Sequence, residues 1–191
     1  MYLHGSMTIT TDIHPQYTVG TWKLDPTHSE VSFSVKHLMI SKVRGTFETF
    51  DVTIVTAENP ADSTIDATID VASVNTGVEA RDQHLRTSDF FLVEEHPEMV
   101  FHSTEFTGTP DNFTVTGDLT LRGVTKPVVL TGEFGGLIVD GYGQTRAGAT
   151  ATTKINRHDF GVSWNNALEG GGVTLGDDVT INLDLQVVLQ P

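Results

Sequence analysis

The 191-residue sequence contains no cysteine, and this absence removes several kinds of chemistry at once. Disulfides, zinc thiolate sites, iron–sulfur clusters and cysteine nucleophiles all require thiols. Basic residues are also few, because 11 Lys and Arg stand against 25 Asp and Glu, for a formal net charge of −14. Proteins that bind the phosphate backbone of a nucleic acid need the opposite sign, so we expect no nucleic-acid partner.

Long apolar runs are missing as well. No uninterrupted apolar stretch of about 18 residues occurs, so no membrane-spanning helix is expected. The N-terminus, MYLHGSMTITTDIHPQYTVG, has no basic stretch followed by an apolar run of the kind that a secretory signal needs. We therefore expect a cytoplasmic location. Residues 1–16 read as an irregular N-terminal segment in which Met7 is an alternative start, and residues 17–191 read as one domain.

The sequence has strong period-two alternation of apolar and polar residues, which is typical of half-buried β-strands. EVSFSVKH places Val31, Phe33 and Val35 on one face, and DVTINLDLQVV does the same with Ile181 and Leu183. Further alternating runs lie near 17–25, 43–55, 63–74, 98–107, 112–121, 127–139 and 144–155. Short turns separate them, at Gly123 and near Gly141 for example. Eight or nine antiparallel strands joined in this way predict a barrel or a sandwich.

One segment, VEARDQHLRTSDFFLVEE, departs from this pattern. Its residues 79–88 are acceptable helix formers, so a short helix is expected there. Asp82 and Arg86 are four residues apart and are expected to pair on one helix face. A second polar cluster, NRHDF, offers a similar pair, Arg157 with Asp159, because a buried arginine needs a partner.

Motifs for catalysis or metal binding are scarce. GxSxG and GxxxxGK[ST] are both absent. None of the eight histidines has a neighbour two apart on a strand or four apart on a helix, so we predict no metal site and no cofactor. Asp25, His28 and Ser29 are triad residue types, but they are nearly consecutive, and turn chemistry is the favoured interpretation. No catalytic residue is predicted.

Four blocks, in order, carry a family resemblance: WKLDPTHSEVSFSVKHLMISKVRGTF, ARDQHLRTSDFFLVEEHPEMVFHST, TGDLTLRGVTKPV and AGATATTKINRHDFGVSWN. Together they resemble the YceI family of polyisoprenoid-binding-like proteins over nearly all of residues 17–189. The resemblance implies an all-β fold, a lipocalin-like eight-stranded antiparallel β-barrel with a short helical segment near residues 78–90. It also implies a tunnel that holds a polyisoprenoid, a quinone tail or a fatty amide or acid, and a homodimer. Many members are periplasmic, in contrast to the cytoplasmic location expected above.

The expected function is therefore non-enzymatic: a carrier, storage or sequestration protein for a long-chain lipid. Arg81, His84, Arg86 and Arg157 are candidates for contact with a polar head group. The residues predicted to contact the apolar chain are Val31, Phe33, Val35, Phe47, Ile65, Ile69, Leu85, Phe90, Phe91, Phe101, Trp164, Ile181 and Leu183, of which Leu85, Phe90, Phe91 and Trp164 are expected near the mouth.

Two alternatives stay open at this point. One is an enzyme that uses His84 or His158 as acid or base in the same cavity. The other is a structural barrel whose interior is filled by its own side chains, because an eight-stranded barrel is just wide enough either to be filled or to hold one slender ligand.

Overall fold

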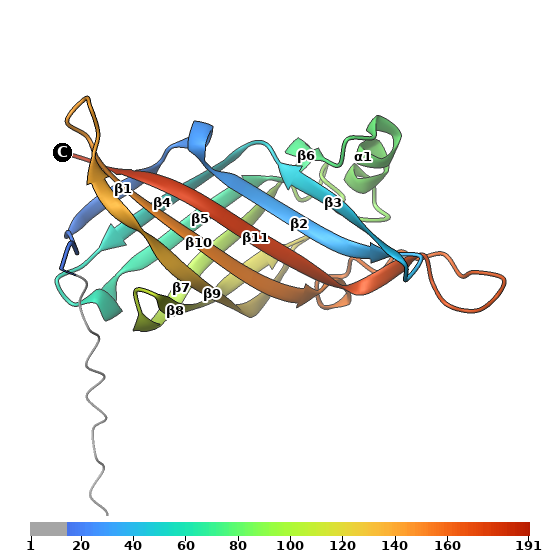
Figure 1. The fold of residues 1–191 in the computed structure, drawn as a ribbon. Coiled ribbons are helices and arrows are strands. Elements are labelled where there is room, and N and C mark those ends of the chain that lie inside the picture. The colour runs from blue at the N-terminus through green and yellow to red at the C-terminus, as the bar shows by residue number, and fades with distance from the viewer. Residues whose placement is uncertain (1–14) are drawn as a thin grey trace, which may run out of the picture.

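The computed structural model describes residues 15–191 of the chain, and most of them form one sheet that closes on itself. Around the closed ring the order is β1–β4–β5–β7–β8–β9–β10–β11, and β11 pairs back onto β1. Every pairing is antiparallel, so the predicted eight-stranded antiparallel β-barrel is confirmed (Figure 1). Of the segment expected to be irregular, residues 1–14 lie outside the described residues. The strands are β1 (Gly20–Leu24), β2 (Glu30–His37), β3 (Ser41–Phe47), β4 (Phe50–Thr56), β5 (Thr64–Asp70), β6 (Val74–Asn75), β7 (Glu98–Thr109), β8 (Asn112–Leu121), β9 (Val124–Val139), β10 (Thr145–Asn156) and β11 (Leu175–Leu189).

Strands that follow one another in the chain can share one neighbour or arise from one alternating run. β1 and β2 both lie along β11, β1 against residues 187–189 and β2 against residues 175–184. The short 3-10 helix η1 (Pro26–His28) separates them, with Asp25 as its N-cap. The run at 43–55 is likewise divided into β3 and β4, so one pattern of alternation yields two strands.

The two hairpin turns expected at Gly123 and near Gly141 are present in the structure. Arg122 and Gly123, which join β8 to β9, have φ angles of 51° and 74°, as a type I′ hairpin turn requires. The turn between β9 and β10 contains Asp140 and Gly143, and Gly143 has a φ of 79°. Both expected hairpins are confirmed.

Large aromatic side chains cover glycines inside the barrel. A Cβ atom added to Gly45 would lie 2.5 Å from Cζ of Phe33, and one added to Gly132 would lie 2.7 Å from Cζ of Phe113. The two members of each pair are opposite one another on neighbouring strands. A phenylalanine ring therefore fills the place that a side chain at the glycine would occupy.

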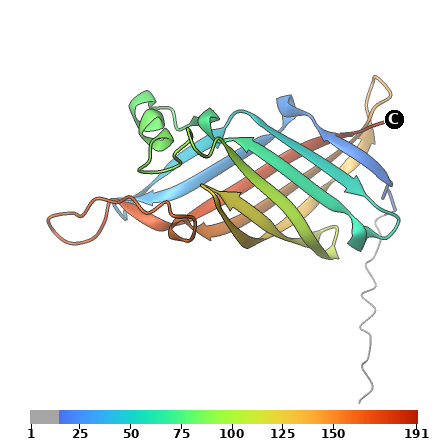
Figure 2. The same ribbon diagram turned by 180° about the vertical axis from the view of Figure 1, so that it is seen from behind.

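The predicted helix is α1 (Glu79–Arg86), and it sits at one end of the barrel (Figure 2). Asp82 and Arg86 bind the segment that precedes the helix rather than each other. Asp82 accepts hydrogen bonds from the backbone N and the hydroxyl of Thr76, at 2.9 and 2.6 Å. Arg86 donates to the carbonyl oxygens of Ala72 and Val74. The expected Asp82–Arg86 ion pair is therefore wrong, because each side chain already has closer partners in the segment that precedes the helix.

No helix within residues 15–191 has the length and apolar character to cross a bilayer.

Candidate ligand-binding cavity

The barrel encloses a cavity of about 360 Å³. A volume of this size falls within the range of about 300–1,000 Å³ that small-molecule sites occupy. Among residues 15–191, none of those that line it is Asp, Glu, Lys, Arg or His. Most of the lining comes from the inward faces of β4, β5, β7, β8, β9, β10 and β11, and includes Val52, Ile54, Ile65, Ala67, Ile69, Met99, Phe101, Phe113, Val115, Leu119, Val128, Leu130, Ala147, Ala149, Ala151, Ile181, Leu183, Leu185 and Val187.

Loops at one end of the barrel also line the cavity and form its opening. Tyr17 and Thr18 precede β1, Ala61 belongs to the 3-10 helix η2 (Pro60–Asp62), and Gly108 and Thr109 end β7. Ala61, Gly108 and Thr109 are exposed. In Figure 1 these segments gather at the left end, opposite α1.

The opposite end is closed by a plug of buried apolar side chains. Phe90 and Phe160 are 6% and 1% exposed, and neither lines the cavity. The ring of Phe90 lies 5.3 Å from that of Trp164, and Phe91 lies 6.0 Å from Phe47. The segment that contains α1 therefore packs over a closed end.

The structure divides the residues predicted to contact the lipid chain into two groups. Those that line the cavity are Val31, Ile65, Ile69, Phe101, Ile181 and Leu183. The second group lies outside its lining, with Phe33, Phe47, Leu85, Phe90, Phe91 and Trp164 in or against the core that closes the other end, and Val35 half-buried on β2. Lipid contact by any of these residues stays a prediction.

Several lining residues were missed by the sequence reasoning. The most informative are Ala147, Ala149 and Ala151, which alternate along β10 in AGATATT. Their small side chains leave space that larger residues would fill. The alternation of this run is visible in the sequence, and small residues on its inward face are the sign of room for a ligand.

The four candidates for head-group contact also lie outside the cavity lining. Arg81 donates to the hydroxyl and carbonyl oxygens of Thr76, and the ring of His84 lies edge-on to Trp164 at 5.0 Å. Arg157 is only 4% exposed, and it donates to the carbonyl oxygens of Gly176, Val162 and Trp164.

Burial lowers the pKa of Arg157. Among residues 15–191 no ion pair joins Arg157 to Asp159, so that expected pair is wrong. Arg157 donates its hydrogen bonds instead to the backbone carbonyl oxygens of Val162, Trp164 and Gly176.

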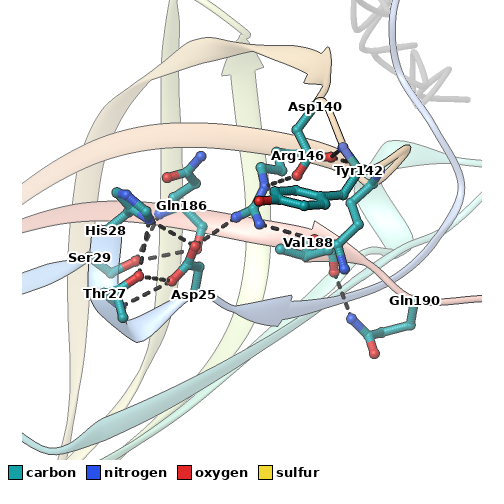
Figure 3. A network of polar contacts seen from close by, with 11 residues as sticks. Asp25, Thr27, His28, Ser29, Asp140, Tyr142, Arg146, Gln186, Val188 and Gln190 are labelled. Carbon is teal, nitrogen blue, oxygen red and sulfur yellow. Dashed lines mark hydrogen bonds and ion pairs between the residues drawn. The ribbon is translucent and has the colours of Figure 1, made fainter.

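The DPTHS turn belongs to a polar network on the barrel wall, close to the β9–β10 hairpin (Figure 3). Arg146 donates to Asp25 and to Asp140, each at 2.6 Å. The hydroxyl of Thr27 donates to Asp25 at 2.7 Å, and Nδ1 of His28 lies 2.9 Å from the same carboxylate. Since Ala147 lines the cavity and successive strand residues face opposite sides, Arg146 lies on the outer face.

These contacts shift the acidity of both carboxyl groups. The bond from the Thr27 hydroxyl, followed by those from His28 and Arg146, holds the pKa of Asp25 far below its usual range. Arg146 is the main reason that the pKa of Asp140 is lowered. The network ties the break between β1 and β2 to the β9–β10 hairpin, and the predicted turn is confirmed.

The geometry supports neither a triad of Asp25, His28 and Ser29 nor an acid or base role in the cavity for His84 or His158. The Ser29 hydroxyl bonds to the backbone of Gln186 rather than to His28. His84 and His158 pair with Asp89 and Asp177, and neither histidine lines the cavity. Among residues 15–191, no cluster of three His, Asp or Glu side chains has the geometry of a metal site.

The described residues form a closed antiparallel β-barrel around a cavity, and this defines the structural class of the chain. Comparison with known sequences then identifies the family: residues 22–187 match the YceI-like domain, and the chain belongs to the YceI family. A UPF0312 protein of Staphylococcus aureus (strain N315) is 40% identical over 158 residues, which are 81% of this chain and 90% of the relative. A UPF0312 protein of Photorhabdus laumondii is 44% identical over 134 residues, 70% of each chain.

Solved structures share the fold. The YCEI protein of Campylobacter jejuni is 32% identical, with a TM-score of 0.71 over 93% of this chain and all of its own. A polyisoprenoid binding domain from Saccharophagus degradans is 16% identical, with a TM-score of 0.66 over 91% of this chain and all of its own, and this likeness concerns the fold alone.

Proposed function

We propose that this barrel binds one long apolar chain in its interior, of the polyisoprenoid, quinone-tail or fatty-acyl type, as a carrier, storage or sequestration protein. The observation that carries the proposal is the cavity of about 360 Å³, whose lining within residues 15–191 contains no charged residue. Family membership and the fold shared with a polyisoprenoid binding domain support it. The cavity also argues against a barrel filled by its own side chains.

The size of the cavity suggests how much of a chain is covered. If each methylene takes about the 30 Å³ share of a liquid water molecule, about a dozen methylene-sized groups fit without movement of the wall. Burial stabilises each group by about 0.8 kcal/mol. Immobilising a flexible chain opposes much of this gain, so a longer chain that extends beyond the mouth gains little further affinity.

Mass spectrometry of the purified protein tests the proposal. The protein is measured first intact under native conditions and then after extraction into organic solvent. We expect a mass increment of one chain per barrel, which extraction removes and which reappears when the lipid is added back. A protein that carries no chain and takes up none from an excess of long-chain alcohols or prenols would refute the proposal.

The homodimer expected from the resemblance and the cytoplasmic location remain predictions.

A further inference from the structure

The cavity wall also carries information about the polar end of its ligand. On the basis of the proposed lipid-binding function, we infer that this barrel takes chains with an uncharged head group, such as an alcohol, an amide or a quinone, and discriminates against carboxylates and phosphates. Three observations support this: the chemistry of the lining, the hydrogen bonds at the mouth, and the charges just outside it.

The first observation is that an anionic head has no cation to meet inside the cavity. In the part of the chain that the structure describes, none of the lining residues is Lys, Arg or His. Taking an ionised group out of water without a partner is strongly unfavourable, and an uncharged polar head is far easier to desolvate. A carboxylate or phosphate would therefore have to remain in solvent, which draws the attached chain partly out of the cavity.

The second observation concerns which hydroxyl groups at the mouth are available. Tyr17 donates to the carbonyl oxygen of Ala57 at 2.6 Å and lies 3.0 Å from the Ser63 hydroxyl, which accepts from the backbone N of Ala57. These polar groups are occupied with one another. Within the described part of the chain, the hydroxyls of Thr107 and Thr109 have no hydrogen-bond partner. Phe106 faces inward opposite Val115, so the next residue, Thr107, faces the outside of the barrel, while Thr109 ends β7 at the rim. A hydroxyl at this rim both donates and accepts, which suits an alcohol, an amide or a carbonyl.

The third observation is that acidic residues adjoin several lining residues of the loops at the mouth. Asp62 lies between two lining residues, Ala61 and Ser63, and Asp111 directly follows Pro110, which is also a lining residue. Glu58 belongs to the same loop as Asp62, and all three acidic side chains are exposed.

Arg146 directly precedes the lining residue Ala147 on β10. Its guanidinium already forms ion pairs with Asp25 and Asp140. Because charges in physiological salt act over only about 8 Å, these local carboxylates matter more for an approaching head group than the net charge of the whole chain. An anionic head group at the mouth is therefore repelled.

A matched set of ligands separates the head group from the chain. Equilibrium dialysis at pH 8, with quantification by mass spectrometry, compares dodecanol, dodecanamide, dodecanoate and dodecyl phosphate. We expect dodecanol and dodecanamide to bind, and both anions to bind at least about tenfold more weakly, which corresponds to about 1.4 kcal/mol. Equal affinity for dodecanoate and dodecanol would overturn the inference while leaving the lipid-binding function intact. Failure of all four ligands to bind would overturn both.

Charge reversal then tests whether the mouth is responsible. Asp62→Lys combined with Asp111→Lys should strengthen dodecanoate binding several-fold and leave dodecanol binding unchanged. The control is Glu94→Lys with Glu95→Lys, which makes the same change in net charge at exposed positions outside the cavity lining and should alter neither affinity. If the control strengthens dodecanoate binding as much as the mouth variant does, discrimination by the mouth is refuted.

Discussion

The ring of Phe101 lies against Gly117, so closely that a Cβ atom on Gly117 would be 2.4 Å from Phe101 Cζ. Phe101 lines the cavity, and Gly117 lies on the next strand, β8. The absence of a side chain at position 117 thus determines where this ring stands, and with it the shape of the cavity at that level.

Replacement of this glycine should therefore strain the barrel. In Gly117→Ala the new methyl group meets both the Phe101 ring and the carbonyl oxygen of His102, which is 2.6 Å away and belongs to the backbone. We expect the free energy of unfolding in urea to fall by about 1–3 kcal/mol, the usual effect of overpacking. Gly141→Ala, where nothing lies within 4 Å of an added Cβ, is the control. Equal stability of the two variants would contradict this packing.

The network around Asp25 should make stability depend on pH. Its lowered pKa in the folded state means that the stabilisation is present above the unfolded-state value of about 3.9 and is lost as the pH falls through the folded-state value. Asp25→Asn should reduce the free energy of unfolding at pH 7 by about 1–3 kcal/mol, since Thr27, His28 and Arg146 lose an ionised acceptor.

Denaturation measured between pH 7 and pH 3 checks this expectation. The difference between wild type and Asp25→Asn should shrink below about pH 4, where the carboxyl group of Asp25 in the unfolded chain takes up a proton while the native carboxylate stays ionised. Asp51→Asn, at an exposed position on β4, serves as the comparison and should unfold like wild type at pH 7. A difference for Asp25→Asn that stayed constant down to pH 3 would show that the charge of Asp25 is not what stabilises the turn.

Arg157 should act on stability and not on ligand binding. Arg157→Met leaves three carbonyl oxygens without their donor, and we expect the free energy of unfolding to fall by about 3 kcal/mol or more. Arg157→Lys should not restore it, because an ammonium cannot present the fork of a guanidinium. Lys154→Met, on the exposed face of β10, is the control. Under conditions where the variants are folded, their affinity for dodecanol should equal that of wild type. A folded Arg157 variant with weakened dodecanol binding would show that Arg157 contributes to the binding site.

Much of the fold could be predicted from the sequence because its signals are local. Alternation in EVSFSVKH and DVTINLDLQVV identified β2 and most of β11, and the change of pattern after Gly77 identified α1. The start of β11 was less visible. Leu175 and Gly176 follow a glycine run, and pairing with β2, rather than intrinsic preference, makes this stretch part of the strand.

The site was harder to predict because it depends on contacts between distant segments. The polar side chains in RDQHLR suggest a ligand contact when they are read alone. In the folded chain Arg81 and Asp82 both bind Thr76, which helps to fasten the helix against the barrel. Conversely, the small residues of AGATA carry no chemical signal, yet they help to create the space that a ligand needs.

The most direct test of ligand binding inside the barrel is a large side chain placed on the inward face of one strand. The same side chain on the outward face of that strand is the control. Ala67 lines the cavity and the adjacent Thr68 is exposed, so Ala67→Trp and Thr68→Trp place the same side chain on opposite faces of β5. Ala149→Phe fills the same cavity with less bulk, should Ala67→Trp fail to fold. Equilibrium dialysis with dodecanol should give one chain per barrel for wild type and Thr68→Trp, and binding at least about tenfold weaker for a folded cavity-filled variant. Wild-type affinity in a folded cavity-filled variant would contradict the claim that the ligand is bound inside the barrel.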